Sequence, residues 1–306
     1  MINKEKYKIA IKNTFLGFIL ADALGVPVEF SSRSQLGKNP VKDMIGYGTY
    51  NMPEGSWSDD SSMTLITLDV LSKYGLNYEK LMSDFIKWYK EGYMTPTDRL
   101  FDIGISTSDA LNKKILGFNA LDCGGKSTYS NGNGSLMRIY PFVFYTMNLS
   151  KEERKKVIFD ASSLTHAHDI SKYGCLILCE YLIKLLNGND KYDAYYEICN
   201  EFKETAPDVY DRLLNKDIYK LNSTSIKSSG YIVDTLEAVI YSFLKYDNYK
   251  DIVLFAINLG EDTDTIGAIV GGLAGMYYKD IPIEWINKLK KLDMILKIIE
   301  DFSNSI

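Results

Sequence analysis

Apolar residues recur along most of the chain at the three- and four-residue spacing that is typical of α-helices. Residues 4–24, for example, place Ile9, Phe15 and Ile19 on one side. Alternating strand patterns are scarce, and the sequence VFYTM after Pro141 is too brief to build a sheet. The pattern predicts an all-α fold with helices over residues 4–24, 61–74, 77–92, 151–163, 170–187, 191–205, 231–245, 249–258, 265–278 and 283–303.

Four segments fall outside the helical pattern, and they hold most of the chemically interesting residues: 25–60, 93–107, 123–141 and 222–230. Long loops inside a compact helical domain are often functional. No linker rich in Pro, Gly or Ser divides the chain, and no internal repeat is present. We therefore expect residues 1–306 to form a single domain whose site is built from loops and helix N-termini.

Charge and hydropathy narrow the class of partner. The net charge of the 306 residues is −5, and the absence of a basic cluster argues against a nucleic-acid partner. The apolar stretch from Phe15 to Ala21 is short, Asp22 interrupts it, and no convincing cleavage site follows. No stretch approaches the roughly 20 apolar residues that span a bilayer. We expect a cytoplasmic protein with no membrane partner.

The cysteines and histidines limit the kind of metal that the protein could hold. Four cysteines form no CxxC pair, and there are only two histidines. A zinc site made of thiolates and imidazoles is therefore not expected. Any metal should be a hard cation bound by oxygen.

Two acidic segments each stand directly before an apolar helix: WSDDSSM at 57–63 and GEDTDT at 260–265. Helix capping explains one polar residue in each segment, but each supplies three or more. Carboxylates crowded together must bind a cation or keep their protons. If the segments meet, they predict a Mg²⁺ or Mn²⁺ site with carboxylates from Asp59, Asp60, Asp262 and Asp264 and hydroxyls from Ser58 and Thr265.

Glycines follow the second acidic segment at a regular spacing. Gly267, Gly271 and Gly275 recur every four residues, and Gly17 and Gly25 mark a similar face of the first helix. Such faces favour close helix packing, and we assign them no chemistry. They could nevertheless bring two site-bearing helices together.

A second kind of signal is the segment YSNGNGSLMRIYP, Tyr129 to Pro141. Its glycines would let backbone N–H groups approach an anion, although the familiar nucleotide motifs do not match and a plain turn is the alternative. Arg138 either binds a phosphate or holds the loop by pairing with an internal carboxylate. His166 and His168 follow in SSLTHAHD, and their spacing suggests that only one lies in the site.

Seven segments in this order carry a resemblance: GFILADALGVPVEF, WSDDSSM, FDIG, NGNGSLMRIYP, SLTHAH, SSGYIVDTLEA and GEDTDTIGAIVGGLAG. Together they resemble the ADP-ribosylglycohydrolase family, which includes the dinitrogenase reductase-activating glycohydrolases and the arginine- and serine-directed ADP-ribosyl hydrolases. The resemblance covers about residues 10 to 280. It implies a compact all-α fold with two Mg²⁺ or Mn²⁺ ions in a cleft and ADP-ribose as the product.

The resemblance also implies roles for individual residues. Glu29 would lie beside the metals, His166 would contact the diphosphate or ribose, Tyr231 would lie near the adenosine, and Asp102 would face a guanidinium leaving group. Ser58 stands where the family usually has Thr. The implied metal ligands are Ser58, Asp59, Asp60, Asp262, Asp264 and Thr265, and the implied substrate-binding residues are Asp102, Asn131, Gly132, Asn133, Gly134, Ser135, Leu136, Met137, His166 and Tyr231.

These residue types suit cleavage of a glycosidic bond at ribose C1″, most simply from an ADP-ribosylated arginine. The candidates for the general base are Glu29 and the ligating aspartates Asp59 and Asp60. Three other functions stay open: a non-catalytic binder of ADP-ribose, a hydrolase of another linkage or of a nucleotide diphosphate, and a protein that occludes a toxin partner. The substrate is expected to be an ADP-ribosylated protein or small molecule.

Overall fold

A computed structural model describes residues 4–306, and in this part of the chain the fold is all-α with no β-strand. The predicted fold class is therefore confirmed. The helices are α1 (Lys4–Gly25), α2 (Arg33–Lys38), α3 (Asp59–Tyr74), α4 (Tyr78–Glu91), α5 (Ile105–Ile115), α6 (Tyr140–Thr146), α7 (Lys151–Ser163), α8 (Asp169–Leu186), α9 (Lys191–Phe202), α10 (Asp211–Leu214), α11 (Ile232–Lys245), α12 (Tyr249–Ile257), α13 (Thr263–Tyr278), α14 (Ile283–Ile286) and α15 (Leu292–Ser305).

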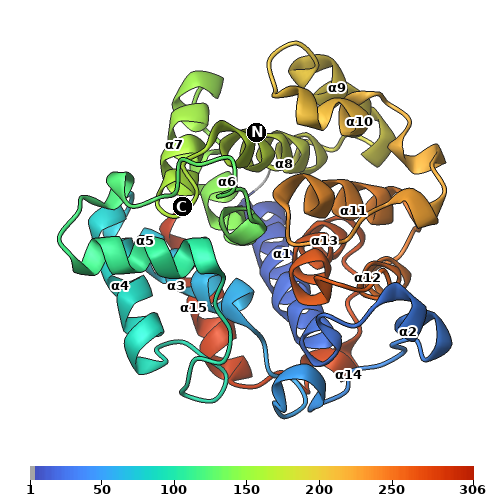
Figure 1. Cartoon of the computed structure of the whole chain (residues 1–306), viewed down its shortest axis with the longest axis horizontal. Helices are drawn as coiled ribbons and strands as arrows, with labels where there is room; N and C mark the ends of the chain where they lie inside the picture. Colours follow the sequence, from blue (N-terminus) through green and yellow to red (C-terminus); the bar gives the residue numbers. More distant parts are fainter. Residues whose placement is uncertain (1–3) are drawn as a thin grey trace.

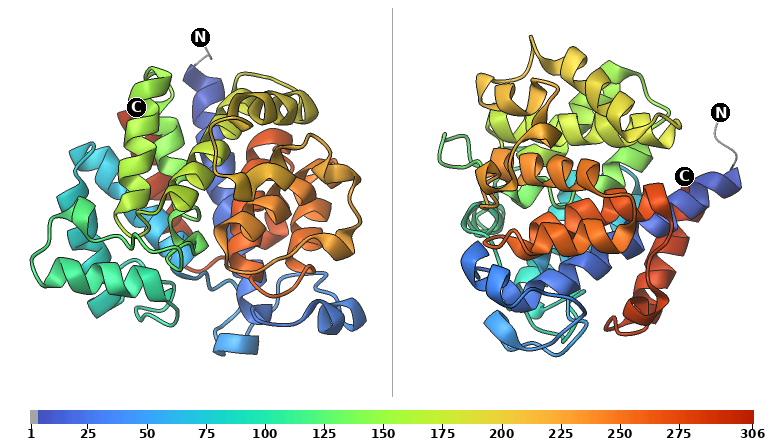
Figure 2. Two further views of the ribbon diagram at one scale, coloured as in Figure 1. Left: turned by 45° about the horizontal axis from the view of Figure 1, so that its top comes forward. Right: turned by 90° about the vertical axis from the view of Figure 1, so that its right-hand side faces the viewer.

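Helix α1 runs through the middle of the molecule with α13 at its side, as Figure 1 and Figure 2 show. Gly17 of α1 and Gly267, Gly271 and Gly275 of α13 face this contact. A Cβ added to Gly17 would lie 2.4 Å from the Gly271 carbonyl oxygen, and one added to Gly275 would lie 2.4 Å from that of Asn13. These distances are too short for any side chain. The interpretation of the glycine spacing as close helix packing is confirmed.

The central position of α1 also explains its composition. The segment Lys4–Val28 is long and apolar enough to cross a membrane by length and composition, so the prediction that no stretch approaches this length is wrong. Yet 83% of its most apolar 18-residue window is buried inside the structure. A helix that is covered on all sides is apolar all round, whether protein or lipid covers it. The segment is therefore weak evidence for a membrane span.

The structure adds helices inside the segments predicted to be irregular. Helix α2 lies within 25–60, α5 begins within 93–107, and α6 begins within 123–141 and includes the first four residues of VFYTM, Val143 to Thr146. These helices are short or lie at the ends of the predicted segments, where sequence patterns give the weakest signal.

The last predicted helix, 283–303, is instead two helices, α14 and α15. Between them the backbone packs against the segment before α3. Lys290 N–H donates to the Gly55 carbonyl at 3.0 Å, and the Trp57 indole donates to the Lys290 carbonyl at 3.3 Å. Lys291 then adopts a left-handed conformation with φ of 53°. A distant contact thus breaks a helix that its local pattern favours.

One hydrophobic cluster connects the elements around α1. Helix α3 packs against α4, α6 and α15 on one side of it, and α11 packs against α8, α12 and α13 on the other (Figure 1). The N-terminus of α3 and the N-terminus of α13 both lie beside the C-terminal half of α1. The two predicted acidic segments end at these two helix starts.

Candidate metal and substrate site

The two acidic segments meet in space. Asp60 Oδ2 accepts hydrogen bonds from the Ser58 hydroxyl at 2.9 Å and from the Thr265 hydroxyl at 3.3 Å. Carboxylate oxygens of Asp22, Asp60 and Asp264 lie within 4.8 Å of one another, and all three residues are buried. The expectation that WSDD and GEDTDT form one cluster is confirmed.

Asp22 joins the cluster from α1, and sequence reasoning missed it. Its carboxylate accepts the Ser58 N–H at 3.0 Å, the Ser61 N–H at 3.1 Å and the Ser61 hydroxyl at 2.5 Å. It therefore holds the first turn of α3 against α1. In the sequence Asp22 stands out only as an interruption of an apolar stretch. A lone acid in a helix that is otherwise buried and apolar is itself a signal, because burying a charge is costly unless it has partners.

Backbone contact fixes the distance between α1 and the second acidic segment. A Cβ added to Gly25 would lie 2.4 Å from Asp264 Cα, and the Thr263 hydroxyl donates to the Gly25 carbonyl at 2.8 Å. The first turn of α13 therefore sits directly on the end of α1. Glu261, the additional acid of this segment, is exposed and lies in a left-handed conformation with φ of 62°.

A second group of carboxylates shares Asp264 with the first. Oxygens of Glu29, Asp102 and Asp264 lie within 4.8 Å of one another. Glu29 follows the 3₁₀ turn Val26–Val28 that continues α1, and the Tyr50 hydroxyl donates to Glu29 Oε2 at 2.6 Å. Nothing in the sequence pattern pointed to Tyr50. The structure thus brings Glu29 and Asp102 together with the predicted metal ligands.

Burial and mutual repulsion perturb these carboxyl groups strongly. Burial raises the pKa of Asp22 to about 6, and burial together with the charges of Asp102 and Asp262 raises the pKa of Glu29 to about 8. Burial, and after it the charges of neighbouring acids, raises the pKa values of Asp59, Asp60 and Asp264 well above their usual range. Burial also raises the pKa of Asp102 and of Asp262. Protein groups alone do not balance this charge.

Two carboxylate oxygens without a hydrogen-bond partner indicate what could neutralise the negative charge of this cluster. Asp60 Oδ1 and Asp262 Oδ1 are buried and have no hydrogen-bond partner among the described residues. A buried acceptor that protein leaves unsatisfied usually has a ligand or ordered water. Carboxylate and hydroxyl oxygens are the donor set of a hard divalent cation. The cluster therefore fits metal ions, as the sequence pattern predicted.

The glycine-rich segment lies on the other side of Asp262. Asn133 donates through Nδ2 to Asp262 Oδ2 at 2.7 Å, and its backbone N–H donates to the Gly230 carbonyl at 3.0 Å. Gly132 pairs with Tyr231 in an isolated antiparallel bridge. Tyr231, half-buried, thus stands beside the segment. One predicted substrate segment and one predicted adenosine contact are brought together with the acidic cluster.

The end of the glycine-rich segment turns into the core. The side chains of Ser135, Leu136 and Met137 are buried. Ser135 Oγ accepts the Ser162 hydroxyl at 3.0 Å, which ties the segment to α7. A substrate contact at these three positions would have to come from backbone atoms.

Both histidines contact the glycine-rich segment. A Cβ added to Gly134 would lie 2.9 Å from His166 Cε1, so the ring packs on the glycines. His168 caps α8, and its Nδ1 lies 3.2 Å from Asn131 Nδ2. Of the two alternatives for Arg138, binding a phosphate or holding the loop, the contacts favour the second, through the Ala161 carbonyl at 3.1 Å and the Thr165 hydroxyl at 2.8 Å and not through a carboxylate.

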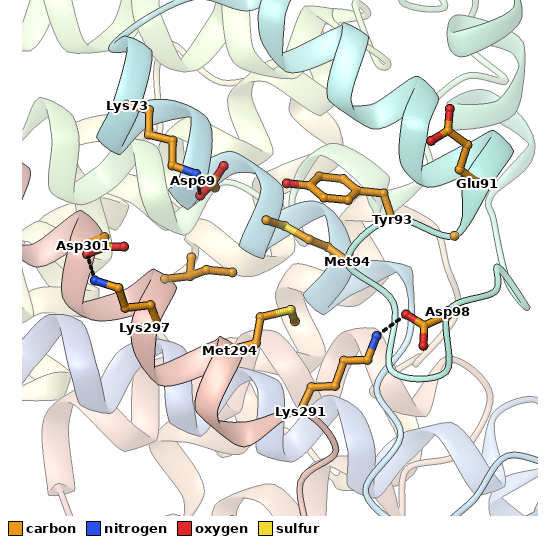
Figure 3. A pocket seen from close by; sticks show the side chains of 12 residues that line it. Asp69, Lys73, Glu91, Tyr93, Met94, Asp98, Lys291, Met294, Lys297 and Asp301 are labelled. Carbon is orange, nitrogen blue, oxygen red and sulfur yellow. Dashed lines mark hydrogen bonds and ion pairs between the residues drawn. The ribbon is translucent and has the colours of Figure 1, made fainter.

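A surface groove of about 550 Å³ lies apart from these residues, between α3, α15 and the segment after α4 (Figure 3). Its lysines are each paired with an aspartate: Lys73 with Asp69, Lys291 with Asp98 and Lys297 with Asp301. None of the predicted site residues lines it. The groove carries no part of the site described above.

Fold and site together define a class: an all-α protein whose buried carboxylates meet at helix ends beside a glycine-rich segment. Residues 3–306 match the model of the ADP-ribosylglycohydrolase family, and the chain belongs to this family. It is 32% identical over 298 residues to the ADP-ribosylarginine hydrolase Tri1 of Pseudomonas putida, covering 95% of this chain and 76% of the relative. It is 28% identical to the ADP-ribosyl-[dinitrogen reductase] glycohydrolase of Rhodospirillum rubrum, covering 90% of this chain and 88% of the relative.

A solved structure titled ADP-ribosylglycohydrolase-related protein complex has the same fold. Its TM-score is 0.85 over 98% of this chain and 99% of that chain, at 24% sequence identity. The family resemblance noted from the sequence is therefore confirmed. The protein is a glycosidase that hydrolyses ADP-ribose linkages in ADP-ribosylated substrates.

Proposed function

We propose that this enzyme releases ADP-ribose from ADP-ribosylated arginine and that it uses two Mg²⁺ or Mn²⁺ ions. The observation that carries the proposal is the meeting of two carboxylate groups at Asp264, one with Asp22 and Asp60 and one with Glu29 and Asp102. The name of the Pseudomonas putida relative, an ADP-ribosylarginine hydrolase, supports the choice of linkage.

The chain offers enough oxygens for two ions. The ligand set we propose is the one predicted from the sequence, Ser58, Asp59, Asp60, Asp262, Asp264 and Thr265, and the orphaned oxygens of Asp60 and Asp262 support it. Divalent ions bound there would supply Lewis acidity next to the ribose that carries the scissile bond. The remaining chemistry falls to groups of the chain itself.

Glu29 is the proposed general base. Without metal, burial and two neighbouring acids raise the pKa of Glu29 to about 8. Divalent cations beside it would lower this pKa and leave the carboxylate ionised, as a general base must be. The Tyr50 hydroxyl, which donates to Oε2 at 2.6 Å, leaves Oε1 to take a proton from water. Asp102, within 4.8 Å of the same carboxylate, is placed to accept hydrogen bonds from a guanidinium leaving group.

A linkage panel tests this proposal. Arginine-, serine- and acid-linked ADP-ribosyl peptides are incubated with Mg²⁺, Mn²⁺ or EDTA, and free ADP-ribose is measured. We expect release from the arginine linkage, loss of release in EDTA, and loss in Glu29→Gln and Asp262→Ala. Release of AMP or phosphate, or unchanged turnover in both variants, would contradict the proposal.

Asp102→Asn separates the choice of linkage from catalysis in general. The substitution keeps the size of the side chain and removes the charge that would bind a guanidinium. We expect it to reduce release from arginine by a larger factor than from any other linkage that the wild type accepts. An equal reduction on every linkage would show that Asp102 does not recognise arginine.

The cytoplasmic location stays a prediction, which cell fractionation tests.

A further inference from the structure

A short chain of hydrogen bonds ends at His166. Arg138 Nη2 lies 2.8 Å from Thr165 Oγ1, and Thr165 Oγ1 lies 2.8 Å from His166 Nδ1. All three side chains are buried, with His166 only 2% exposed. No carboxylate of the described residues pairs with this arginine, and its guanidinium lies instead over the Phe85 ring, 5.4 Å from the centroid.

The direction of these hydrogen bonds follows from chemistry. A guanidinium can only donate, so Thr165 Oγ1 accepts from Arg138. The hydroxyl then has one hydrogen to give, and His166 Nδ1 is the only other group within hydrogen-bond distance among the described residues. If Nδ1 carried the proton instead, the buried Thr165 hydrogen would have no acceptor, which is unfavourable. Nδ1 is therefore the acceptor, and the ring proton sits on Nε2.

The ring carries only this one proton. Burial and the nearby charge of Arg138 lower the pKa of His166 to about 3, so the imidazole is neutral at physiological pH. A neutral imidazole with an accepting Nδ1 is a single N–H donor at Nε2.

That donor faces the glycine-rich segment. A Cβ added to Gly132 or to Gly134 would lie 3.5 Å from His166 Nε2. No acceptor among residues 4–306 lies within hydrogen-bond distance of Nε2. Asn133, which lies between these two glycines, donates through Nδ2 to Asp262 Oδ2 at 2.7 Å. The segment that His166 Nε2 faces is therefore in direct contact with the acidic cluster.

We propose that Arg138 and Thr165 are positioning residues that hold His166 as the Nε2–H tautomer and direct this N–H at an oxygen acceptor of the bound ADP-ribosyl group. The identity of the ligand rests on the proposed function; the tautomer does not. Arg138 acts twice in this arrangement, because it orients the hydroxyl and its charge disfavours a second proton on the ring. Within residues 4–306 the hydrogen-bond partners of this buried arginine are the Thr165 hydroxyl and the Ala161 carbonyl, and its Nε and Nη1 have none.

Nitrogen NMR of the full chain tests the tautomer directly. The protein has only two histidines, so ¹⁵N-histidine labelling gives two pairs of ring signals. At pH 8 we expect both rings as Nε2–H, because His168 Nδ1 accepts from the Ile170 N–H and from Asn131. Thr165→Val, which removes the hydroxyl, should change the ring signals of His166 and leave those of His168 in place.

Thr165→Ser is the matched control, because it keeps the hydroxyl and should keep the Nε2–H tautomer of His166. Wild-type protein with His166 as Nδ1–H, or Thr165→Val with unchanged His166 signals, would overturn the proposal. If Thr165→Val does not fold, the wild type and Thr165→Ser still test the tautomer of His166, since both keep the hydroxyl and must show Nε2–H.

Calorimetric titration with ADP-ribose in Mg²⁺ tests the donor role. We expect Thr165→Val to weaken binding about tenfold, the scale of one well-placed hydrogen bond, and Thr165→Ser to bind within about twofold of the wild type. His166→Gln, whose amide nitrogen reaches the place of Nε2, should bind better than His166→Asn. Unchanged binding in Thr165→Val would exclude the donor role even if the tautomer is correct.

Titration with ADP locates the acceptor. An equal loss for ADP and ADP-ribose places it on the diphosphate, and a loss for ADP-ribose alone places it on the second ribose. Failure of the wild type to bind ADP-ribose at all would contradict the proposed function, while the NMR result would stand by itself.

Discussion

The acidic half and the glycine-rich half of the site are organised in opposite ways. In the acidic half, buried carboxylates face one another, and two of their oxygens, on Asp60 and Asp262, have no partner. In the glycine-rich half, Asn131, Asn133 and Thr165 are all hydrogen-bonded within the protein. Among the described residues, the acidic half leaves unpaired acceptors, which suit a cation, whereas the glycine-rich half leaves unpaired donors, the His166 Nε2–H and the Nε and Nη1 of Arg138.

This difference separates two ways of binding. The acidic half stores repulsion that a cation would relieve, so its folding and its metal affinity are coupled. The glycine-rich half keeps its groups in place at no further cost when the ligand binds, which is the advantage of preorganisation. Asn133 links the two, because it donates to Asp262 and its backbone belongs to the glycine-rich segment.

The largest effect is expected from Asp60→Asn. Burial and the charges of Asp22, Asp59 and Asp262 raise the pKa of Asp60, so a neutral amide relieves repulsion in metal-free protein. Without metal, Tm should rise or stay level; with Mg²⁺, activity should fall by about a hundredfold or more, and the metal-induced rise in Tm should shrink. Thermal shift with and without Mg²⁺ and release of ADP-ribose measure these effects. Asp109→Asn, on an exposed face of α5, is the control.

Gly25→Ala tests whether backbone contact sets the acidic half. Its methyl group would lie 2.4 Å from Asp264 Cα, so α13 has to move away from α1. Overpacking of this kind costs about 1–3 kcal/mol, and the shift of Asp264 should reduce activity about tenfold or more. Gly37→Ala is the matched control, because nothing lies within 4 Å of its added Cβ and α2 should become slightly more stable. Equal activity in both variants would show that the site tolerates the displacement.

The dependence of stability on pH should distinguish the halves without any mutation. The pKa of Asp22 is about 6 and that of Glu29 about 8, both above the unfolded values near 4. Their stabilising contribution is therefore complete below pH 4 and is lost as pH rises through 6 to 8. His166 acts in the opposite direction below about pH 6.5, because burial and the charge of Arg138 lower its pKa to about 3. In EDTA, Tm should therefore fall between about pH 7 and 8, and Mg²⁺ should flatten the fall. A Tm that rises with pH in EDTA above about pH 7 would contradict the repulsion described here.

The smallest effect is expected at the groove of Figure 3, which belongs to neither half. Lys297 pairs with Asp301 at 2.6 Å on the surface of α15, and such pairs contribute about 0–1 kcal/mol. Lys297→Ala should leave ADP-ribose release within about twofold of the wild type and change Tm by no more than about 2 °C. A tenfold loss of activity would connect the groove to the site.

Local sequence patterns were sufficient for the long helices and for the two acidic segments, because both signals lie within a few residues. The break before Lys291 was not predictable in this way, since its cause is a contact with Gly55 and Trp57, more than 200 residues away in sequence. Asp22 and Tyr50 were missed for the same reason. Asp22 lies in the segment GFILADALGVPVEF, but its role, like that of Tyr50, appears only when α1 and the segment before α3 come together.

The contact between α1 and α13 has a consequence for when activity can appear. The Thr263 hydroxyl and the Gly25 carbonyl that it contacts are 238 residues apart. Contacts at such separation form late, because the closing of a long loop costs entropy before any contact compensates for it. During synthesis, the central helix has to wait for its partner until most of the chain has left the ribosome. A nascent or C-terminally truncated chain therefore carries Asp22, Glu29 and Asp60 but has no completed site for its substrate.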